Sequence, residues 1–394
     1  MEIKKVAYEN FRNIAEAEVA FTPGTNVLWG NNAQGKTNIL EGIYFFARGK
    51  SFRASSDRET VRFGEQCARA ELTFRRAASA RETVLEAYIP ASGKKKLLRS
   101  GAPLSGVSEM IGDFTAVLFC PEHLSLVSGS PAGRRSFLDI ASAQLSGVYV
   151  GELRRFMRAL DQRNALIRSC RQGGVYVSDA EWEALAAVMA PSAAYIAGAR
   201  REYVGRLSGF VAEHFERMTS GNEIPEISYK TQVLPDEDEG AAPVSEMAAR
   251  IERLLCENTE REIAAGTTLY GVHRDDLVIK LNGREAKSYA SQGQTRSLSL
   301  AMKLAEGEIA GESGGEYPVF LLDDVLSELD SERRTYILGA LRDRQIIVTS
   351  CEPELYSGRE TANLINMVIS DFEGNRGEVM NRVETLCKKY PLYE

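Results

Sequence analysis

The segment at residues 30–37 constrains this chain more than any other, because it reads Gly-Asn-Asn-Ala-Gln-Gly-Lys-Thr. It fits the pattern G-x-x-x-x-G-K-[ST], in which backbone N–H groups surround phosphates, the lysine reaches the outer phosphates and the hydroxyl can ligate Mg²⁺. Residues 26–29 form a short, mostly apolar strand candidate before it. Four apolar residues after it share the spacing of one helix face: Ile39, Leu40, Ile43 and Phe46. A strand, loop and helix in this order place a helix N-terminus at the phosphates, so the sequence predicts a domain that binds a nucleoside triphosphate.

Composition and charge place the chain among ordinary globular proteins. Hydrophobic residues make up 44% and charged residues 26% of the 394 residues, a length that suggests two or three domains. No apolar run approaches a membrane span, and the first residues are charged, unlike a signal peptide. Six scattered cysteines without a C-x-x-C pair indicate reduced thiols, and three histidines argue against a multi-His metal site. We therefore expect a cytoplasmic protein without a membrane partner.

Strand and helix patterns change along the chain. Residues 1–126 mix both, and the polar turn at 94–96 is interpreted as a solvated loop. Residues 127–265 carry three helical series, the second of which continues to Phe215 with Pro191 as a kink or break. This part also contains an acidic, breaker-rich loop at 234–243. It therefore reads as an inserted helical domain.

Strand character returns in residues 266–394. Residues 277–281 precede Asn282-Gly283, a strong hairpin signal with its partner strand near 285–289. A helix begins near Thr295, and residues 319–322 and 345–349 read as buried parallel strands. The predicted fold class is α/β, with a nucleotide-binding head assembled from residues 1–126 and 266–394.

Two carboxylates end the apolar strand candidate at 318–324. A strand that ends in such a carboxylate can hold Mg²⁺ opposite the hydroxyl of a phosphate loop. We expect Asp323 and Thr37 to hold the metal and Asp324 to orient the attacking water. The alternative is a strand that leads into an acidic surface turn.

Two further segments are informative because of their order along the chain. Residues 291–294 read Ser-Gln-Gly-Gln before an amphipathic helix, and residues 327–330 read Ser-Glu-Leu-Asp after the Asp323 strand. A serine and a glycine at a helix start can bind an anion, although serine caps many ordinary helices. The order of phosphate loop, Ser-x-Gly-Gln, Asp-Asp strand and Ser-x-Leu-Asp is more specific than any single segment.

This order resembles the ATPase heads of ABC-type proteins, in which the Ser-x-Gly-Gln signature of one copy caps the nucleotide held by another. Further segments at 10–13, 119–122, 129–139 and 273–276 make the chain similar to the RecF family of bacterial DNA replication and repair ATPases, relatives of SMC and RecN proteins. The matching segments run from residue 3 to about 350. The resemblance implies ATP and Mg²⁺ as cofactors and a head-to-tail dimer that forms with ATP.

The resemblance also implies a set of site residues. Metal ligands would be Thr37 and Asp323, and residues of the catalytic step Lys36, Glu122 and Asp324. Nucleotide contacts would come from Arg12, Asn13, Gly30, Asn31, Asn32, Ala33, Gln34, Gly35, Lys36, Thr37, Asn38, Ser291, Gly293, Gln294, Asp330 and Thr349. Ser291 and Gly293 would act on the nucleotide of the other copy.

Some of these positions have simpler interpretations or depart from the pattern. Arg12-Asn13 could be an ordinary turn, Glu122 a helix cap, and residues 273–276, with Arg274 near the head, an ion-pair turn. Transporter ATPases carry Gln at the position of Glu122, Glu at that of Asp324, and His where this chain has 349–350. The latter two departures predict slow turnover.

Net charge is −7, so DNA binding would need a local basic surface. Arginines of the helical insertion could neutralise DNA phosphates without reading bases. The candidates are Arg134, Arg135, Arg154 and Arg158. Each could equally lie on the solvated face of an amphipathic helix.

We therefore expect an ATP-dependent DNA-binding protein of recombinational repair and replication restart. ATP would close the dimer on gaps or single-strand/duplex junctions, and slow, DNA-dependent hydrolysis would release it. RecR and RecO are implied as partners by the resemblance alone. Three alternative functions are the ATP-hydrolysing subunit of an ABC transporter, an SMC-like chromosome organiser and a P-loop kinase. A chromosome organiser would need arms with far longer heptad repeats. A kinase would not need the Ser-x-Gly-Gln signature.

Overall fold

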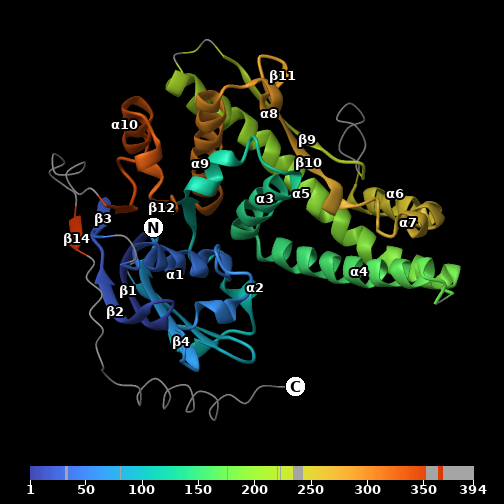
Figure 1. Ribbon diagram of the computed structural model, residues 1–394, viewed down its shortest axis with the longest axis horizontal. Coiled ribbons are helices and arrows are strands. Elements are labelled where there is room, and N and C mark those ends of the chain that lie inside the picture. The colour runs from blue at the N-terminus through green and yellow to red at the C-terminus, as the bar shows by residue number, and fades with distance from the viewer. Residues whose placement is uncertain are drawn as a thin grey trace. The chain divides into compact units, whose positions relative to one another are not determined.

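The computed structural model shown in Figure 1 describes residues 1–31, 34–79, 81–174, 176–219, 221, 223–233, 243–351 and 363–366. The chain divides into two compact units: unit 1 comprises residues 1–123 and 306–394, and unit 2 comprises residues 124–305. The second boundary falls inside helix α9 (Gln292–Gly314). The sequence pattern placed this boundary at 265. The difference arises because a strand inside the predicted insertion pairs with a strand beyond it.

Unit 1 contains a six-stranded antiparallel sheet in the order β2-β1-β4-β5-β6-β7. Its strands are β1 (Glu2–Phe11), β2 (Ile14–Ala20), β4 (Cys67–Arg75), β5 (Glu82–Pro90), β6 (Lys96–Arg99) and β7 (Ala102–Pro103). Alternate residues such as Val6, Tyr8 and Leu72 are buried, as expected for a sheet with one face on the core. The Tyr8 hydroxyl donates to the Ile39 carbonyl at 2.8 Å and so fixes helix α1 (Lys36–Arg48) on this sheet.

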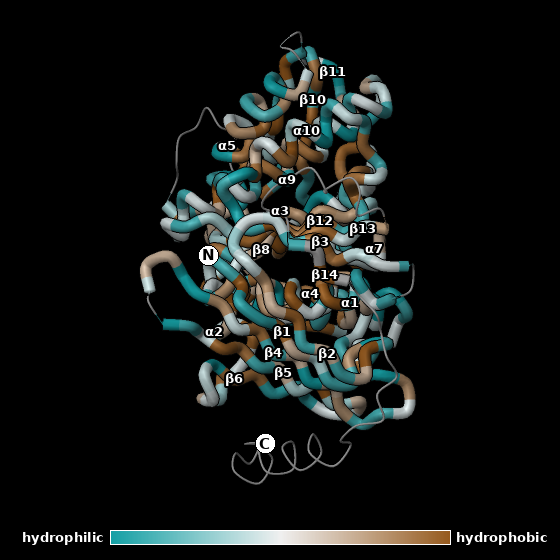
Figure 2. The backbone as a smooth tube through the Cα atoms, turned by 90° about the vertical axis from the view of Figure 1, so that its left-hand side faces the viewer, coloured by the Kyte–Doolittle hydropathy of each residue, from teal (hydrophilic) through white to brown (hydrophobic). Residues whose placement is uncertain are grey.

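The second sheet of unit 1 is parallel, in the order β14-β3-β13-β12-β8. Its strands are β3 (Thr25–Trp29), β8 (Ala116–Phe119), β12 (Val319–Asp323), β13 (Ile346–Ser350) and β14 (Asn363–Asn366). Strands β12 and β13 are buried along their whole length, and Figure 2 shows their apolar character. The two predicted parallel strands are therefore confirmed. Because parallel strands end at one edge, the residues after β3, β8, β12 and β13 meet there.

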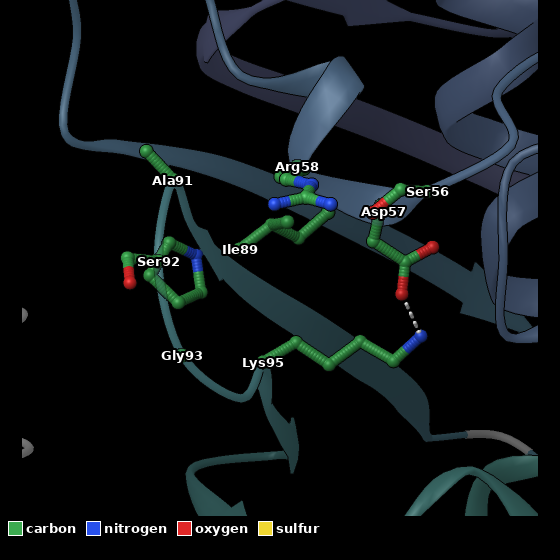
Figure 3. A pocket seen from close by; sticks show the side chains of 9 residues that line it. Ser56, Asp57, Arg58, Ile89, Ala91, Ser92, Gly93 and Lys95 are labelled. Atoms are coloured by element: carbon green, nitrogen blue, oxygen red, sulfur yellow. Dashed lines mark hydrogen bonds and ion pairs between the residues drawn. The ribbon is translucent and has the colours of Figure 1, made fainter.

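Short helical elements complete unit 1. They are η1 (Asp57–Thr60), α2 (Val107–Met110), η2 (Pro121–Ser125), η5 (Val325–Glu328) and α10 (Ser331–Ala340). The expected solvated loop at 94–96 is confirmed only for Lys94, which is exposed and outside any strand. Lys95 donates to the Gly49 carbonyl and the Asp57 carboxylate, at the border of the pocket in Figure 3, and Lys96 begins β6.

Unit 2 combines helices with a three-stranded antiparallel sheet in the order β11-β10-β9. Its strands are β9 (Pro225–Lys230), β10 (Asp276–Leu281) and β11 (Arg284–Glu285). Its helical elements are α3 (Pro131–Leu145), α4 (Gly147–Arg171), α5 (Asp179–Thr219), α6 (Val244–Glu257), α7 (Thr259–Ala265), η4 (Val272–Arg274), α8 (Ala286–Tyr289) and the first part of α9. Helices α4, α5 and α6 share an apolar core that contains Phe156, Met189 and Ile251.

Two local predictions in unit 2 need correction. Pro191 does not break α5, which runs through it, because Ser192 and the alanines around it are buried and the packing of the helix outweighs the lost hydrogen bond. The hairpin at Asn282-Gly283 is confirmed by the pairing of Leu281 with Arg284, but the second strand ends at Glu285 and α8 follows. The loop at 234–242 lies outside the described residues.

Candidate nucleotide-binding site

The phosphate loop connects β3 to α1 at the carboxyl edge of the parallel sheet. Gly35 precedes the helix with a φ of 79°, a left-handed conformation that favours glycine and turns the chain into the first helical turn. Lys36 to Arg48 then form a buried helix whose N-terminal N–H groups have no acceptor within the helix. Asn32 and Ala33 of the predicted loop lie outside the described residues. Asn31 and Gln34 border them.

The Lys36 ammonium group is held over the phosphate loop. Its Nζ donates to the carbonyl oxygens of Gly30 at 2.6 Å and Asn31 at 2.9 Å, and lies 3.5 Å from the Cys351 Sγ. The residue is only 9% exposed. A buried ammonium bound to neutral carbonyls is a strong site for an anion, because a phosphate oxygen would be a better partner than either carbonyl.

A hydroxyl and a carboxylate meet opposite the lysine. Thr37 Oγ1 donates to Asp323 Oδ1 at 2.8 Å, and Thr349 Oγ1 donates to the same oxygen at 2.9 Å. Burial raises the pKa of the Asp323 carboxyl, while the hydrogen bonds from the two threonines oppose that rise. The register of β12 on β13 pairs Asp323 with Thr349, so the sheet itself aligns this trio.

These oxygen donors fit a magnesium ion. Mg²⁺ prefers hard oxygen ligands and in phosphate loops takes one or two protein ligands together with phosphates and waters. Among the described residues no cluster of three His, Cys, Asp or Glu side chains could hold a metal without such help. The hydroxyl of Thr37 and the carboxylate of Asp323 are the oxygen donors that could hold such an ion together with the phosphates of a nucleotide.

Asp324 lies next to this trio but is exposed. Its φ is 51°, which is left-handed and uncommon for a residue other than glycine. The Asp324 N–H donates to Thr349 Oγ1 at 2.9 Å, and Ser327 Oγ donates to the Asp324 carbonyl at 2.6 Å. The backbone is thus held in a strained conformation at the end of β12, as residues of active sites often are.

Arg12 and Asn13 lie beside the start of α1 rather than in a free turn. The Arg12 guanidinium forms an ion pair with Glu41, which is fully buried, and its NH1 donates to the Glu59 carbonyl at 2.8 Å. Asn38 Nδ2 donates to Asn13 Oδ1 at 2.5 Å. The turn that carries these two residues is therefore attached to the helix that follows the phosphate loop.

Two residues near the site were not predicted. Glu41 anchors Arg12 from inside α1, and Arg53 donates to Asn38 Oδ1 at 3.1 Å and lowers the pKa of Asp323 through its charge. Glu41 had a usable signal, since it is a charged residue within an apolar stretch of the predicted helix. Arg53 follows that helix in a loop with no recognisable pattern.

The remaining predicted residues of unit 1 lie at the same edge of the parallel sheet or after it. Glu122 is exposed in η2, which directly follows β8, the neighbour of β12. Asp330 caps α10, where its Oδ1 accepts from the Arg333 N–H at 2.9 Å, and this backbone hydrogen bond lowers the pKa of the Asp330 carboxyl.

The signature segment belongs to unit 2 and starts α9. The Gln294 N–H donates to Ser291 Oγ at 3.2 Å, and the Ser291 N–H donates to Gln294 Oε1 at 2.6 Å, a reciprocal arrangement known as a capping box. Ser291 is exposed and Gly293 is half-buried. The exposed Ser291 hydroxyl therefore lies at the N-terminus of a helix of 23 residues, a place that favours an anion.

Arg134 is not available for DNA, which corrects the prediction. It is 5% exposed and forms two hydrogen bonds of 2.8 Å with the Asp276 carboxylate. Arg135 is half-buried and donates to the Asp275 carbonyl at 2.8 Å. These contacts join the segments at 129–139 and 273–276 within unit 2. In this structure both segments therefore help to hold α3 against the start of β10.

Arg154 and Arg158 fit the prediction better. Both are exposed on α4, one turn apart, and neither forms an ion pair with the residues that the structure describes. Like charges at this spacing repel each other weakly, so the pair does not stabilise the helix. Arg155 differs, because its NH1 bonds Glu152 at 2.8 Å.

His273 packs against the ring of Phe156 in unit 2. Its Nε2 donates to the Thr268 carbonyl at 3.1 Å, while the buried Nδ1 has no hydrogen-bond partner among the described residues. Burial lowers the pKa of His273 to about 4. The side chain is therefore a neutral, largely enclosed part of unit 2 near neutral pH.

Comparison with known proteins gives a consistent result. The family described as RecF/RecN/SMC N terminal domain matches residues 2–371. A relative from Limosilactobacillus fermentum named DNA replication and repair protein RecF is 39% identical over 355 residues, covering 89% of this chain and 92% of the relative. A relative of the same name from Halalkalibacterium halodurans is 38% identical over 352 residues, with coverage of 89% and 92%.

Solved structures of RecF and of an Smc head are also similar to this chain. The recombination mediator protein RecF with ATPrS, described as part of the RecFOR pathway, matches with a TM-score of 0.83, 31% identity and coverage of 89% of this chain and 92% of that one. A head of an Smc protein bound to a ScpA domain matches with a TM-score of 0.53 and 15% identity, covering 94% and 95%, and supports the fold alone. The predicted ATPase-head fold is confirmed. In the described part of the chain, no helix has the length and apolar character needed to cross a membrane.

Proposed function

The chain belongs to the RecF family of DNA replication and repair proteins, and we propose that it is an ATP-switched DNA-binding protein of recombinational repair and replication restart. Two copies pair head to tail with ATP between them and hold DNA at gaps or single-strand/duplex junctions. Slow, DNA-dependent hydrolysis of ATP opens the pair and releases the DNA.

One observation supports this proposal above the others: groups suited to binding an anion occur in two different parts of the chain, one in each unit. Lys36, Thr37 and Asp323 converge in unit 1. In unit 2 the exposed Ser291 begins a long helix, and Tyr289 beside it is 70% exposed. An exposed aromatic residue next to an anion-binding helix start is suited to a surface that a second copy covers.

The residues of unit 1 bind and orient the triphosphate. Lys36 exchanges its carbonyl partners for phosphate oxygens, and the first N–H groups of α1 donate to the same phosphates. Thr37 and Asp323 hold Mg²⁺, which neutralises charge on the phosphates when it is bound. Arg12 and Asn13 border the start of α1, where contacts with the rest of the nucleotide are expected.

Hydrolysis depends on the exposed carboxylate after β12. Asp324 orients the attacking water and accepts its proton, and Glu122 contributes a second carboxylate from η2. Thr349 Oγ1 donates to Asp323 and accepts from the Asp324 N–H. It therefore links the carboxylate proposed to hold the metal to the residue proposed to orient the water. Asp324 is shorter than a glutamate and no histidine follows β13, so turnover is slow.

The second copy completes the site. Ser291, Gly293 and Gln294 approach the outer phosphate from its side, and Asp330 belongs to the segment that meets the partner. Neither copy hydrolyses ATP efficiently alone, because the charge that develops on the outer phosphate needs donors from both.

DNA is held through phosphate contacts from the exposed arginines of α4. Arg154 and Arg158 supply unpaired positive charge, and Arg135 contributes less because it already has a partner. RecR and RecO are proposed partners, since a structurally similar relative is described within the RecFOR pathway. The setting is cytoplasmic. The rival role, a transporter ATPase, predicts membrane association in fractionation.

Light scattering of the purified protein with and without ATP and gapped duplex, at two salt concentrations, tests this function. We expect a monomer without ATP, a dimer with ATP, and a dimer–DNA complex that weakens as salt rises. A particle that binds ATP and stays monomeric under all conditions would contradict the proposal.

A further inference from the structure

The side-chain amide of Gln294, in the signature segment, forms one hydrogen bond through its oxygen and another through its nitrogen. Its Oε1 accepts from the Ser291 N–H at 2.6 Å, within the capping box. Its Nε2 donates to Oε1 of Glu223, a residue 71 positions earlier in the chain. An amide that bonds at both ends has little freedom to rotate. The position of Glu223 therefore sets the orientation of Gln294 and, through it, of Ser291.

Glu223 is not part of a free loop. The next residue, Ile224, donates its N–H to Asn282 Oδ1 at 2.8 Å and accepts from the Asn282 N–H at 2.9 Å. This reciprocal pair extends the ladder of β9 and β10 to the turn at Asn282-Gly283. Glu223 is thus attached to the end of a sheet, and the same turn leads through β11 and α8 to Ser291 (Figure 1).

The sheet also connects to the helices of unit 2. Helix α5 packs against β9 and against α4, which carries the exposed Arg154 and Arg158. Arg200 of α5 adds an ion pair with Asp275 at 3.3 Å, directly before β10. A shift of α4 and α5 on contact with DNA would therefore move the sheet, and with it the carboxylate that holds Gln294.

We propose that Glu223 is a positioning residue that couples the DNA-binding helices to the signature. The inference rests on the proposed function, in which Ser291 acts on the nucleotide of the partner copy. When α5 and β9 are in the DNA-bound position, Glu223 holds Gln294 so that the Ser291 hydroxyl faces the incoming phosphate. Without that hydrogen bond the signature still caps α9, but its orientation no longer follows the helices that contact DNA.

Glu223→Ala tests the coupling in the full chain. Loss of a hydrogen bond to a charged acceptor should lower DNA-stimulated ATP turnover about fivefold or more. The affinity of isolated copies for ATP and the melting temperature should not change, since Glu223 lies outside the phosphate loop and is half-buried. Glu223→Gln keeps an acceptor oxygen and should restore stimulation. Glu223→Asp keeps the charge on a shorter side chain and should give an intermediate value.

Glu226→Ala is the matched control, because it removes the same charge from an exposed position of β9. It should behave as the unaltered protein. The inference is overturned if Glu223→Ala is stimulated by DNA as strongly as the control. It is also overturned if Glu223→Gln and Glu223→Ala lose stability and activity equally. An unaltered protein that neither pairs with ATP nor responds to DNA would instead contradict the proposed function, before any variant is compared.

Discussion

The phosphate loop region of unit 1 and the signature segment of unit 2, the two candidate anion-binding regions, differ in burial and in hydrogen bonding. In unit 1, Lys36 and Asp323 are buried and Thr37 is half-buried, and all three are hydrogen-bonded to one another or to the loop. In unit 2, Ser291 is exposed and bonded only within its own helix start. A preorganised site can bind a nucleotide alone, whereas an exposed helix start needs a second surface to exclude water. Under the proposed function, this difference would let a single copy bind ATP at unit 1 and require a second copy for the contact with Ser291.

Asp324→Asn should have the largest effect, on the chemistry of unit 1 alone. The amide keeps the shape of the side chain but cannot accept a proton, so ATP turnover should fall about 10²–10⁴-fold while ATP binding persists. The ATP-bound dimer should accumulate. Asp343→Asn is the control, because Asp343 is an exposed carboxylate away from the site. Normal turnover of Asp324→Asn would move the catalytic role to another carboxylate.

Lys36→Ala should remove ATP binding and pairing together. Loss of a buried ammonium that binds phosphate oxygens should weaken ATP affinity by about two orders of magnitude. Titration with a fluorescent ATP analogue and light scattering measure the two effects. Lys5→Ala, which breaks an exposed ion pair with Glu18, should change neither. Dimerisation of Lys36→Ala with ATP at the usual concentration would contradict the role given to unit 1.

Ser291→Arg should separate the two regions. The bulky cation at the start of α9 should block pairing, while single copies keep their affinity for ATP because the phosphate loop is untouched. Sedimentation at saturating ATP tests the first effect and equilibrium binding the second. Ser313→Arg makes the same change at an exposed position near the other end of α9 and should still pair. Loss of ATP binding by single copies of Ser291→Arg would show that the signature acts within its own chain.

His273→Gln should make unit 2 less sensitive to acid. The pKa of His273 is lowered to about 4 in the folded chain. As the pH falls below about 6.5, the imidazole therefore becomes protonated in the unfolded chain while it stays neutral in the folded chain. The stability that the neutral imidazole contributes is therefore complete above pH 6.5 and is lost as the pH falls towards 4. Between pH 7.5 and pH 5 this loss amounts to about 2 kcal/mol, and the variant should not show it. Urea unfolding at the two pH values measures it, and an unchanged pH dependence would contradict the burial argument.

Arg154→Ala together with Arg158→Ala should have the smallest effect, on DNA alone. If each arginine neutralises one phosphate, the slope of log K against log salt should fall by about 2. ATP binding should not change. Arg155→Ala is the control, because Arg155 is already paired with Glu152. If both variants lost the same affinity for DNA, binding would depend on the net charge of the protein rather than on this face of α4.

Much of the phosphate site could be predicted because its residues are adjacent in sequence to strong periodic patterns. The strand before Gly30, the helix after Lys36 and the strand before Asp323 each follow from hydrophobic spacing, and parallel strands bring their ends together. Glu41 and Arg53 were missed because their importance depends on contacts across the fold with Arg12 and Asn38.

The prediction was weaker in unit 2. Strand β9 is short and lies between two helical series, so its pairing with β10 and the boundary in α9 were not predicted from the sequence. Arg134 was assigned to DNA because a charge pattern does not tell a solvated arginine from one buried against Asp276. A kink or break was predicted at Pro191, and the break did not occur because local propensity ignores the buried packing around this residue.

Sedimentation velocity of Asp324→Asn at saturating ATP tests the central claim most directly. The account predicts that the protein sediments as a dimer with ATP and as a monomer without it, and that Ser291→Arg in the same background sediments as a monomer while still carrying ATP. A single monomeric boundary for Asp324→Asn with ATP bound in every copy would contradict the claim that the nucleotide joins unit 1 of one copy to unit 2 of another.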